Sequence, residues 1–477
     1  MKSILLITPH YPPSNLAAVH RSRLFAKHLP ALGWNPIILT VDENYYEEVL
    51  DWKLHQLLPK DQRIEKVSAF KVTKPRLIGD IGLRGYFQLR RRALELIRSE
   101  KIDFVYIPIP SFYMALLGPY LFKKTGVPYG IDYIDPWVHV FPGSDKIFSR
   151  HWFTTQLAKF LEPIAVKHAS LITGVSEGYY KPVLERNPHL ETQALTAAMP
   201  YGGEESDHDF IRSRGKEHTS PPLPSAGKLN SSTLSTSSTP STCKLIYAGA
   251  MLPKAYKPLE EIFKALSQLQ PSSLRLASST LQLIVSPQPS SDKLNLPQPP
   301  STSLNLLQPP QPLQPLQLSF IGTLGTIKPF AEKYKLWGSA VLEHPDRIPY
   351  LDVLSQLDTA DAVFILGSTE PHYTPSKVYQ AVLSGKPILA VLHEASTAVL
   401  VLRESRAGIV VTMKGEEDLD TLSARFLEGL KEFMLFKQTF DPSKINRAAF
   451  EQYSAKAITA ILVEKLNLIV SSAAGRG

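Results

Sequence analysis

The stretch DAVFILGSTEPHYTPSKVYQAVLSGKPILAVL, residues 361–392, contains a strand, a polar loop, a helix and a second strand in succession. The nearly continuous apolar runs at 361–367 and 387–392 predict strands that are buried on both faces, as in a parallel sheet. In the loop between them, Thr374 is placed to cap a helix that has Pro375 at its first position. The stretch therefore predicts one strand–helix–strand unit of a parallel α/β sheet.

Similar apolar runs, separated by helical patterns, recur along the chain and restart after a segment rich in Ser, Thr and Pro. Alternating strands and helices specify a doubly wound sheet. The predicted fold class is therefore α/β, with two Rossmann-like doubly wound parallel-sheet domains that face a cleft. The predicted strands are 3–8, 35–41, 104–109, 128–134, 170–176, 244–250, 281–286, 318–323, 361–367, 387–392 and 408–413.

The domain organisation is predicted from shifts in composition. An N-terminal Rossmann-like domain covers 1–210, and a linker rich in Ser, Thr and Pro covers 211–243. A second Rossmann-like domain covers 244–425 and carries a Pro/Gln-rich insert at 286–317, and C-terminal helices cover 426–477. Neither biased segment keeps a helical or strand period, so we expect both to be tolerated at the surface. For the insert, a proline-rich ligand for a partner domain is the alternative.

Composition excludes several classes of protein. Of 477 residues, 43% are hydrophobic and 20% are charged, which suits a globular chain and not wholesale disorder. A single cysteine, Cys243, excludes a disulfide framework and a thiolate metal site. The 52 basic and 44 acidic residues give a net charge of +8, which favours anionic partners. This charge is weak for a nucleic-acid binder, so we expect no nucleic-acid partner.

Membrane insertion and secretion are not predicted. The longest uncharged stretch near the N-terminal half, residues 104–122, is interrupted by three prolines and predicts a strand and a loop rather than a membrane span. The first apolar run of the chain is short, ends in prolines and has no small-residue cleavage site, so it does not predict a signal peptide. These features predict a cytoplasmic protein.

The loop at 368–377 is the best candidate for a binding site. Ligands of open α/β sheets bind beyond the carboxyl ends of the strands, in loops that lead into helices. Here the N–H groups of Ser376 and Lys377 accompany a hydroxyl and an ammonium group, and such a combination favours a phosphate. A capped helix with a merely solvated lysine is the alternative.

The segment QAVLSGKP at 380–387 resembles the retaining glycosyltransferases of family 4, which have the GT-B architecture. In that family two glutamates lie eight positions apart; the first helps to hold the donor sugar and the second usually contacts the ribose of the nucleotide. His372 and Gln380 occupy those positions here. The resemblance implies that both residues, together with Thr374, belong to the donor site.

The resemblance extends loosely to four other segments: 5–40, 127–137, 170–180 and 247–266. In the last of these the family places an arginine and a lysine on the donor diphosphate. Ala250 stands at the arginine position, so Lys254 and Lys257 are the candidates, with a solvated side chain as the alternative for each. Ser376 and Lys377, a pair that also occurs in part of the family, complete the implied donor-binding set.

The N-terminal domain is expected to supply the acceptor side of the cleft. Ser14 and Asn15 lie where the family has a Gly-Gly loop, and His10 lies near the same edge. Asp135 follows a predicted strand at its carboxyl end, where a carboxylate can orient an acceptor hydroxyl or accept its proton. We therefore predict that Asp135 is catalytic. An aspartate before proline also starts turns, which is the structural alternative.

A basic amphipathic helix is predicted at 82–101, with five arginines opposite an apolar stripe. Such a helix can touch anionic lipid headgroups, and glycosyltransferases with lipid-linked acceptors dock in that way. Peripheral contact at the inner face of the cell membrane is thus one expectation. A solvated helix that packs on its own domain is the other.

These observations predict an enzyme that transfers a sugar from a nucleotide diphosphate sugar to a hydroxyl acceptor in glycan, polysaccharide or glycolipid synthesis. The resemblance implies a hexosyltransferase that works with retention. No aspartate-rich metal motif occurs in the sequence, so we expect lysines and a helix N-terminus to neutralise the diphosphate without a metal or other cofactor. A nucleotide-sugar epimerase or hydrolase, and a non-catalytic subunit that binds nucleotide sugars, are the alternatives.

Overall fold

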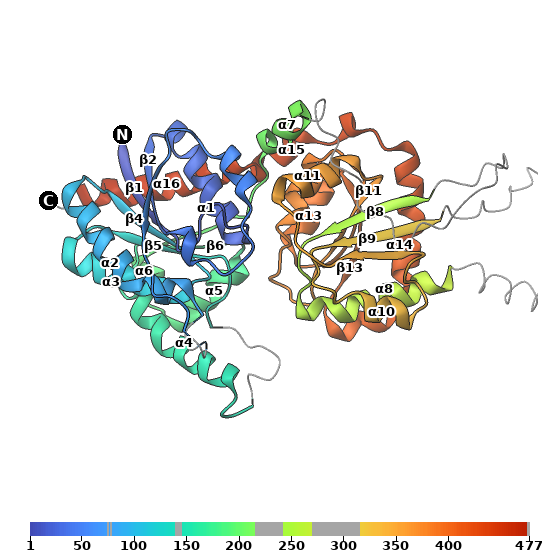
Figure 1. Cartoon of the computed structure of the whole chain (residues 1–477), viewed down its shortest axis with the longest axis horizontal. Coiled ribbons are helices and arrows are strands. Elements are labelled where there is room, and N and C mark those ends of the chain that lie inside the picture. The colour runs from blue at the N-terminus through green and yellow to red at the C-terminus, as the bar shows by residue number, and fades with distance from the viewer. Residues whose placement is uncertain (74–75, 77–78, 139–145, 215–241, 270–314, 475–477) are drawn as a thin grey trace, which may run out of the picture.

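Two α/β domains lie side by side in the computed structural model (Figure 1). The N-terminal domain is drawn in blue to green, and the C-terminal domain in yellow-green to orange. The residues that the structure describes are 1–73, 76, 79–138, 146–214, 242–269 and 315–474.

The N-terminal domain is built on a parallel sheet of seven strands in the order β3-β2-β1-β4-β5-β6-β7. Leu5 and Ile7 point into one hydrophobic core and Ile4 and Leu6 into another, because successive side chains of a strand face opposite sides of the sheet. Both faces are therefore buried, as the continuous apolar runs predict. The strands are β1 (Lys2–Ile7), β2 (Trp34–Val41), β3 (Arg63–Val67), β4 (Phe104–Ile109), β5 (Tyr129–Tyr133), β6 (Leu171–Gly174) and β7 (Leu195–Ala198).

Helices cover both faces of this sheet. One face is covered by α2 (Ile81–Ser99), α3 (Leu117–Thr125), α4 (Arg150–Val166) and α5 (Glu177–Arg186). The other face is covered by α1 (Ala17–His28) and by α16 (Ala455–Ala474), which comes from the far end of the described chain.

The C-terminal domain is built on a parallel sheet of six strands in the order β10-β9-β8-β11-β12-β13. Its strands are β8 (Cys243–Ala248), β9 (Leu316–Ile321), β10 (Val341–His344), β11 (Ala362–Leu366), β12 (Ile388–His393) and β13 (Gly408–Met413). On one face lie α8 (Tyr256–Gln268), α10 (Lys328–Lys333) and α14 (Leu422–Thr439). On the other lie α11 (Tyr350–Thr359), α12 (Lys377–Leu383), α13 (Thr397–Ser405) and α15 (Arg447–Phe450). The two predicted Rossmann-like domains are confirmed.

The boundaries of the biased segments differ from the predicted ones. Helix α7 (Glu205–Arg214) continues to Arg214, so the first four residues assigned to the linker 211–243 are helical. At the other end, Cys243 already begins β8. The predicted insert 286–317 ends too late, because Leu316 and Gln317 belong to β9 and pair with β8. The strand predicted at 281–286 lies outside the described residues.

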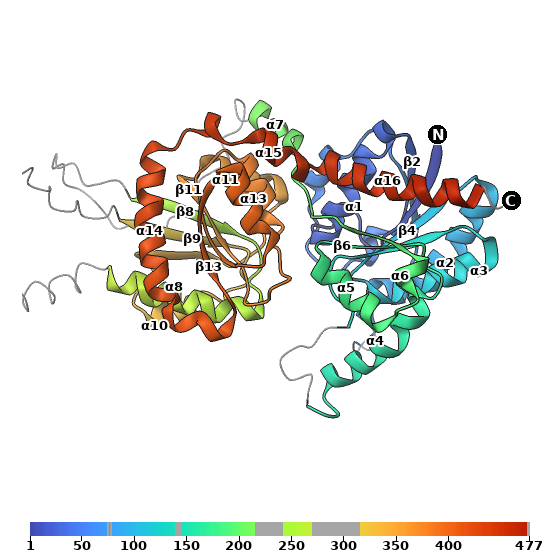
Figure 2. The same cartoon turned by 180° about the vertical axis from the view of Figure 1, so that it is seen from behind.

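The C-terminal helices do not form one unit. Helix α14 packs on the C-terminal sheet, whereas α16 crosses to the N-terminal domain, where Figure 2 shows it in red across the back of that domain. Its buried side chains join the core formed by α1 and one face of β1. The predicted segment 426–477 is thus divided between the two domains.

Candidate functional site

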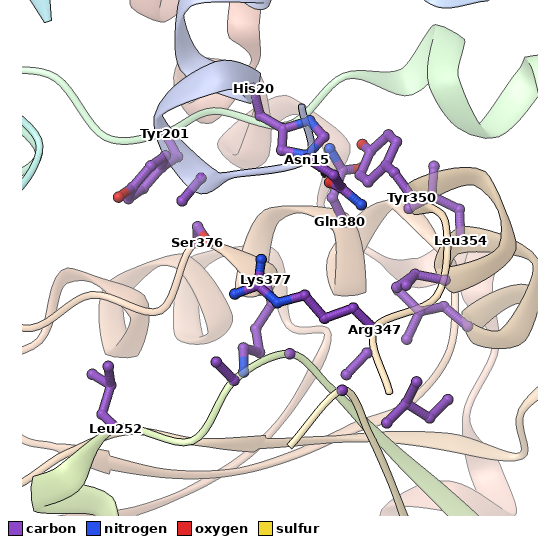
Figure 3. Close-up of a pocket in the computed structure, with 18 of the residues that line it drawn as sticks. Asn15, His20, Tyr201, Leu252, Arg347, Tyr350, Leu354, Ser376, Lys377 and Gln380 are labelled. Atoms are coloured by element: carbon purple, nitrogen blue, oxygen red, sulfur yellow. Dashed lines mark hydrogen bonds between the residues drawn. The ribbon is translucent and has the colours of Figure 1, made fainter. Parts of the chain in front are cut away.

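A cavity of about 370 Å³ lies between the two domains (Figure 3). Its wall includes Ala248 at the end of β8, Ile321 at the end of β9 and Asp135, which follows β5. The cavity therefore lies at the carboxyl ends of both sheets, where ligands of such folds bind. Six predicted site residues line it: Asn15, Asp135, Thr374, Ser376, Lys377 and Gln380.

Lys377 supplies a buried amine to the wall that the C-terminal domain contributes. Its Nζ lies 3.7 Å from the centre of the Tyr247 ring and has no hydrogen-bond partner among the described residues. Burial lowers the pKa of this amine from 10.5 to about 7, because the charged form loses its hydration. Gly249, at φ 124°, leaves the amine room, since a Cβ there would lie 3.2 Å from Nζ. An anion that enters the cavity would provide the missing counter-charge.

Arg347 is a second cation at this wall, and the sequence analysis missed it. Figure 3 shows its side chain extending from the right of the view toward the side where Lys377 is drawn. It is exposed and forms no ion pair with any residue that the structure describes. Arg347 lies in the loop between β10 and α11. It stands just before YLDVLSQL at 350–357, whose apolar residues have helical spacing. That position was the available signal, because loops that lead into helices carry the ligands of α/β sheets.

Three tyrosines lie near Asp135 at the cavity: Tyr179 and Tyr201 on the side of the N-terminal domain, and Tyr373 in the loop before α12 of the C-terminal domain. Burial, together with the negative charge of Asp135, raises the pKa of Tyr179, Tyr201 and Tyr373 well above 10. All three line the cavity, so they stay protonated and present O–H groups near the carboxylate. The sequence analysis did not identify them, because tyrosines in apolar surroundings give no signal of their own.

His20, on α1, also lines the cavity and faces the C-terminal domain in Figure 3. Its Nε2 lies 2.8 Å from Oδ1 of Asn15. Its ring packs against that of Tyr350, with 4.4 Å between the centroids and an angle of 43° between the ring planes. Burial, with a smaller effect of the nearby Arg23 charge, lowers the pKa of His20 to about 3. The imidazole is therefore neutral at physiological pH and positions Asn15 at the cavity.

Gln380 is held in place by His208 of α7, whose ring lies between Gln380 and Asp358. His208 on α7 has Nε2 3.0 Å from Oε1 of Gln380 and Nδ1 3.1 Å from Oδ1 of Asp358. One end of the Gln380 amide is thus engaged within the protein. The other end remains available to a ligand at the cavity.

The predicted cap of α12 is wrong. The helix begins at Lys377, and Ser376, the residue before it, makes no side-chain cap bond. Thr374 is buried, and its Oγ1 lies 2.7 Å from Oγ1 of Thr397 at the start of α13. Because that hydroxyl already has a partner, it joins two loops of the cavity wall instead of capping the helix.

Five predicted site residues do not line the cavity. Lys254 pairs with Glu370 at 3.2 Å, and Lys257 pairs with Glu416 at an exposed surface. The amine of each lysine is thus already paired with a carboxylate. The other three residues outside the lining are His10, Ser14 and His372.

His372 lies in a contact between the domains. Its ring meets that of Tyr179 edge-on with 5.2 Å between centroids, and its carbonyl accepts a hydrogen bond from Ser176 Oγ at 3.3 Å. His10 and Ser14 both bind Glu48. Burial favours the neutral form of Glu48, but these hydrogen bonds outweigh it and lower its pKa to about 2. His10 and Ser14 thus hold a carboxylate in place beside the loop that carries Asn15.

Metal ligands are not gathered in the described part of the chain, where no three His, Cys, Asp or Glu side chains form a group that could hold a metal ion. The positive charge available at the cavity comes from Lys377 and Arg347. Metal independence stays a prediction.

No protein-family model matches the sequence, and no curated protein sequence matches it. Solved structures do resemble the fold. Anabaena HepE in complex with UDP and glucose is 14% identical, with a TM-score of 0.56 over 98% of this chain and 100% of that chain. A glycosyltransferase from Rickettsia africae is 13% identical, with a TM-score of 0.56 over 98% of both chains. Trehalose-6-phosphate synthase from Burkholderia multivorans is 10% identical, with a TM-score of 0.54 over 100% of this chain and 98% of that chain.

A structure from Listeria monocytogenes described as a UDP-N-acetylglucosamine 2-epimerase has 10% identity and a TM-score of 0.50, over 97% of this chain and 95% of that chain. At such identities the likeness concerns the fold alone. The chain thus has the two-domain GT-B architecture, which supports more than one chemistry.

Proposed function

We propose that this protein transfers a glycosyl group from a nucleoside diphosphate sugar to a hydroxyl acceptor. The observation that carries the proposal is the composition of the cavity: the partnerless amine of Lys377 and the guanidinium of Arg347 belong to one domain, and Asp135 to the other. Cations suit the diphosphate of a donor, and a carboxylate across the cleft suits an acceptor hydroxyl.

The comparisons support the same choice. HepE was solved with UDP, with UDP and glucose, and with UDP-glucose, and it shares the fold over nearly the whole of both chains. We therefore take a uridine nucleotide as the first candidate donor. In this proposal Ser376 and Lys377 bind the diphosphate, Arg347 adds a second positive charge, and the amide of Gln380 contacts the ribose.

The proposed reaction proceeds with retention. The bond between the anomeric carbon and the β-phosphate oxygen breaks, and a bond to the acceptor oxygen forms on the same face of the sugar. Asp135 orients the acceptor hydroxyl and assists the removal of its proton, which passes to the leaving phosphate. The cations stabilise the charge that develops on the phosphate, so the proposed chemistry needs no metal or other cofactor.

The proposed acceptor is a glycan or a lipid-linked glycan, which places the protein in polysaccharide or glycolipid synthesis at the inner side of the cell membrane. Closure of the domains over the ligands would exclude water from the cleft. Helix α2 was the predicted lipid contact. Its Arg91 and Arg92 pair with Glu95 and Glu65, so much of its charge is compensated, and the contact stays a prediction.

The decisive experiment compares nucleotide binding in two lysine variants by calorimetry. Lys377→Ala should weaken UDP binding by about 1.5–3 kcal/mol, the scale for losing a charge-assisted hydrogen bond, and leave uridine binding nearly intact. Lys431→Ala, which removes an exposed lysine of α14, is the matched control and should change neither. Equal UDP affinity in the Lys377 variant and the wild type would remove this lysine from the site.

Product analysis separates the proposal from its alternatives. With UDP-sugars and a panel of glycan acceptors, transfer in excess chelator supports a metal-independent transferase. Conversion of the sugar without an acceptor would indicate an epimerase or hydrolase. Nucleotide-sugar binding without any turnover would indicate a binding subunit that has lost its chemistry, and a magnesium-reversible loss in chelator would overturn metal independence.

A further inference from the structure

Helix α4 (Arg150–Val166) is apolar on the side that faces away from the protein. In both Figure 1 and Figure 2 it extends beyond the N-terminal domain at the lower edge of the molecule. Four large apolar side chains on it are exposed, and Phe160 has 68% of its surface accessible. They are Phe153, Leu157, Phe160 and Ile164.

The spacing of these residues makes a continuous stripe. Positions that differ by four, three and four residues lie above one another on a helix, so the four side chains share one face. The opposite face carries Ala158, Glu162 and Ala165, which are buried against the domain. The exposed stripe is therefore not needed for the fold of the domain, because a separate set of residues anchors the helix.

Aromatic side chains extend the stripe at the start of the helix. Ile147 and Phe148 are 68% and 77% exposed, and Phe148 has a left-handed backbone, at φ 65°. Its ring lies 5.7 Å from that of Trp152 and 6.2 Å from that of Phe153, measured between centroids. The exposed side chains of Ile147 and Phe148 thus enlarge the apolar surface at this end of the helix.

The charges around the stripe have one sign. The segment 146–168 exposes four basic side chains: Lys146, Arg150, Lys159 and Lys167. The acidic residue of this segment, Glu162, is buried and accepts hydrogen bonds from Arg186 at 2.7 and 2.9 Å. On α3 (Leu117–Thr125), which packs beside α4, Lys123 and Lys124 are exposed as well. Among the described residues none forms an ion pair with these six basic side chains, so the apolar stripe is flanked by positive charge.

We propose that the outer face of α4 binds the surface of a bilayer that contains anionic lipids, with the helix axis parallel to the membrane. Large apolar side chains flanked by lysine and arginine suit the boundary between acyl chains and acidic headgroups. A second copy of the chain would bring its own lysines against these, and charge complementarity therefore favours the lipid. None of the described helices combines the length and apolar character that crossing a bilayer demands.

The test measures sedimentation of the full chain with vesicles. Wild-type protein should bind vesicles of equimolar phosphatidylcholine and phosphatidylglycerol and bind pure phosphatidylcholine much more weakly. Replacing both Phe153 and Phe160 by serine should lower the partition coefficient about tenfold or more, because two buried aromatic anchors are lost. Lys159→Ala should lower it about fivefold on the anionic vesicles, the scale for one charge near such a surface.

Leu400→Ser with Leu435→Ser is the matched control, because it removes two exposed leucines from helices of the other domain. It should leave the partition coefficient unchanged, and circular dichroism checks that every variant folds. Absence of wild-type binding to anionic vesicles would overturn the proposal, as would equal losses in the serine variant and its control. Concentration-dependent self-association that the Phe153/Phe160 variant abolishes, without vesicle binding, would assign the face to a second copy.

Discussion

Asp135 belongs to the N-terminal domain, across the cavity from Ser376 and Lys377. Asp135→Asn keeps the shape of the side chain and removes its charge and proton-accepting capacity. We expect turnover to fall about 10²–10⁴-fold, the usual contribution of acid–base assistance, with donor Kd within about threefold of the wild type. Steady-state kinetics and calorimetry measure the two quantities.

Two outcomes of the Asp135→Asn experiment would contradict a role in transfer, and they differ in whether the variant folds. A folded Asn variant with normal turnover would end the proposed role in transfer. A variant that loses turnover together with its thermal unfolding transition would show that this aspartate serves the turn before Pro136, which is the structural alternative.

The pKa of Lys377 predicts a pH dependence for nucleotide binding. In the free protein the pKa is about 7, so the amine is mostly neutral above that pH. A bound diphosphate favours the charged form, so binding takes up a proton and affinity should fall about tenfold per pH unit between about pH 7 and pH 9. Calorimetry in buffers with different ionisation enthalpies measures the uptake.

Two controls test whether the pH dependence comes from Lys377 and the diphosphate. Lys377→Met should bind UDP weakly and without that pH dependence, and uridine should bind the wild type equally well at pH 7 and 8. A wild-type affinity for UDP that does not vary over the range would show that the amine is already charged before the ligand arrives.

At the scale of elements, β9 fixes where the Pro/Gln-rich insert ends. Leu316 and Gln317 pair with Cys243 and Lys244 of β8, and the carbonyl of Pro315 accepts a hydrogen bond from Cys243 N at 2.8 Å. Deleting 286–313 and closing with a short Gly/Ser turn should preserve the unfolding temperature and donor affinity, because closure depends weakly on length, about 0.6 kcal/mol per doubling.

A longer deletion, of 286–317, is compared with the deletion of 286–313. Removal of 286–317 takes two residues from β9, so it should cost about 1 kcal/mol for each ladder hydrogen bond lost. Thermal unfolding measures both variants. Equal destabilisation by the two deletions would mean that residues before Pro315 contribute as much to the domain as the strand itself.

The central strands could be predicted from the sequence and some edge strands could not, because the two kinds of strand differ in how much of their surface is covered. Strands buried on both faces are apolar throughout, and β1, β5 and β12 are examples. The edge strand β3 reads RIEKV and β10 reads VLEH, because one side of each has no neighbour and tolerates charge.

The same difference between edge and central strands explains why the sequence pointed to Lys377 and not to Arg347. Arg347 follows β10, a strand that the apolar pattern does not reveal, so the sequence gives no sign that a strand-end loop lies there. Lys377 was identified because it follows a strongly apolar strand, β11. Its burial over Tyr247 depends on packing between distant segments, which the local sequence does not specify.

At the scale of the whole molecule, α7 and α16 both help to connect the two domains. Asp207 on α7 accepts a hydrogen bond from Arg23 Nη2 at 2.6 Å and another from the Tyr350 hydroxyl at 3.0 Å. Arg23 belongs to the N-terminal domain and Tyr350 to the C-terminal one, so Asp207 connects the two domains beside the cavity. Helix α16 then returns the chain to the N-terminal domain.

The role of α16 predicts unequal effects of two similar substitutions on one helix. Leu462 is 0% exposed and packs in the N-terminal core, whereas Leu468 is 53% exposed. Leu462→Ala should lower the free energy of unfolding by about 2–5 kcal/mol, the range for a large-to-small change in a core. Leu468→Ala should change it by about 0.5 kcal/mol or less. Denaturant titration measures both, and equal effects would contradict the packing of α16.

The return of α16 also has a consequence for synthesis on the ribosome. The core beneath α1 lacks the side chains of Ile458, Leu462 and Leu466 until that helix emerges, about 240 residues after α7. At about 5–20 residues per second this takes about 10 to 50 s. During that interval the nascent N-terminal domain exposes apolar surface next to β1. We therefore expect it to need chaperones more than the C-terminal domain, whose elements are made within one continuous span.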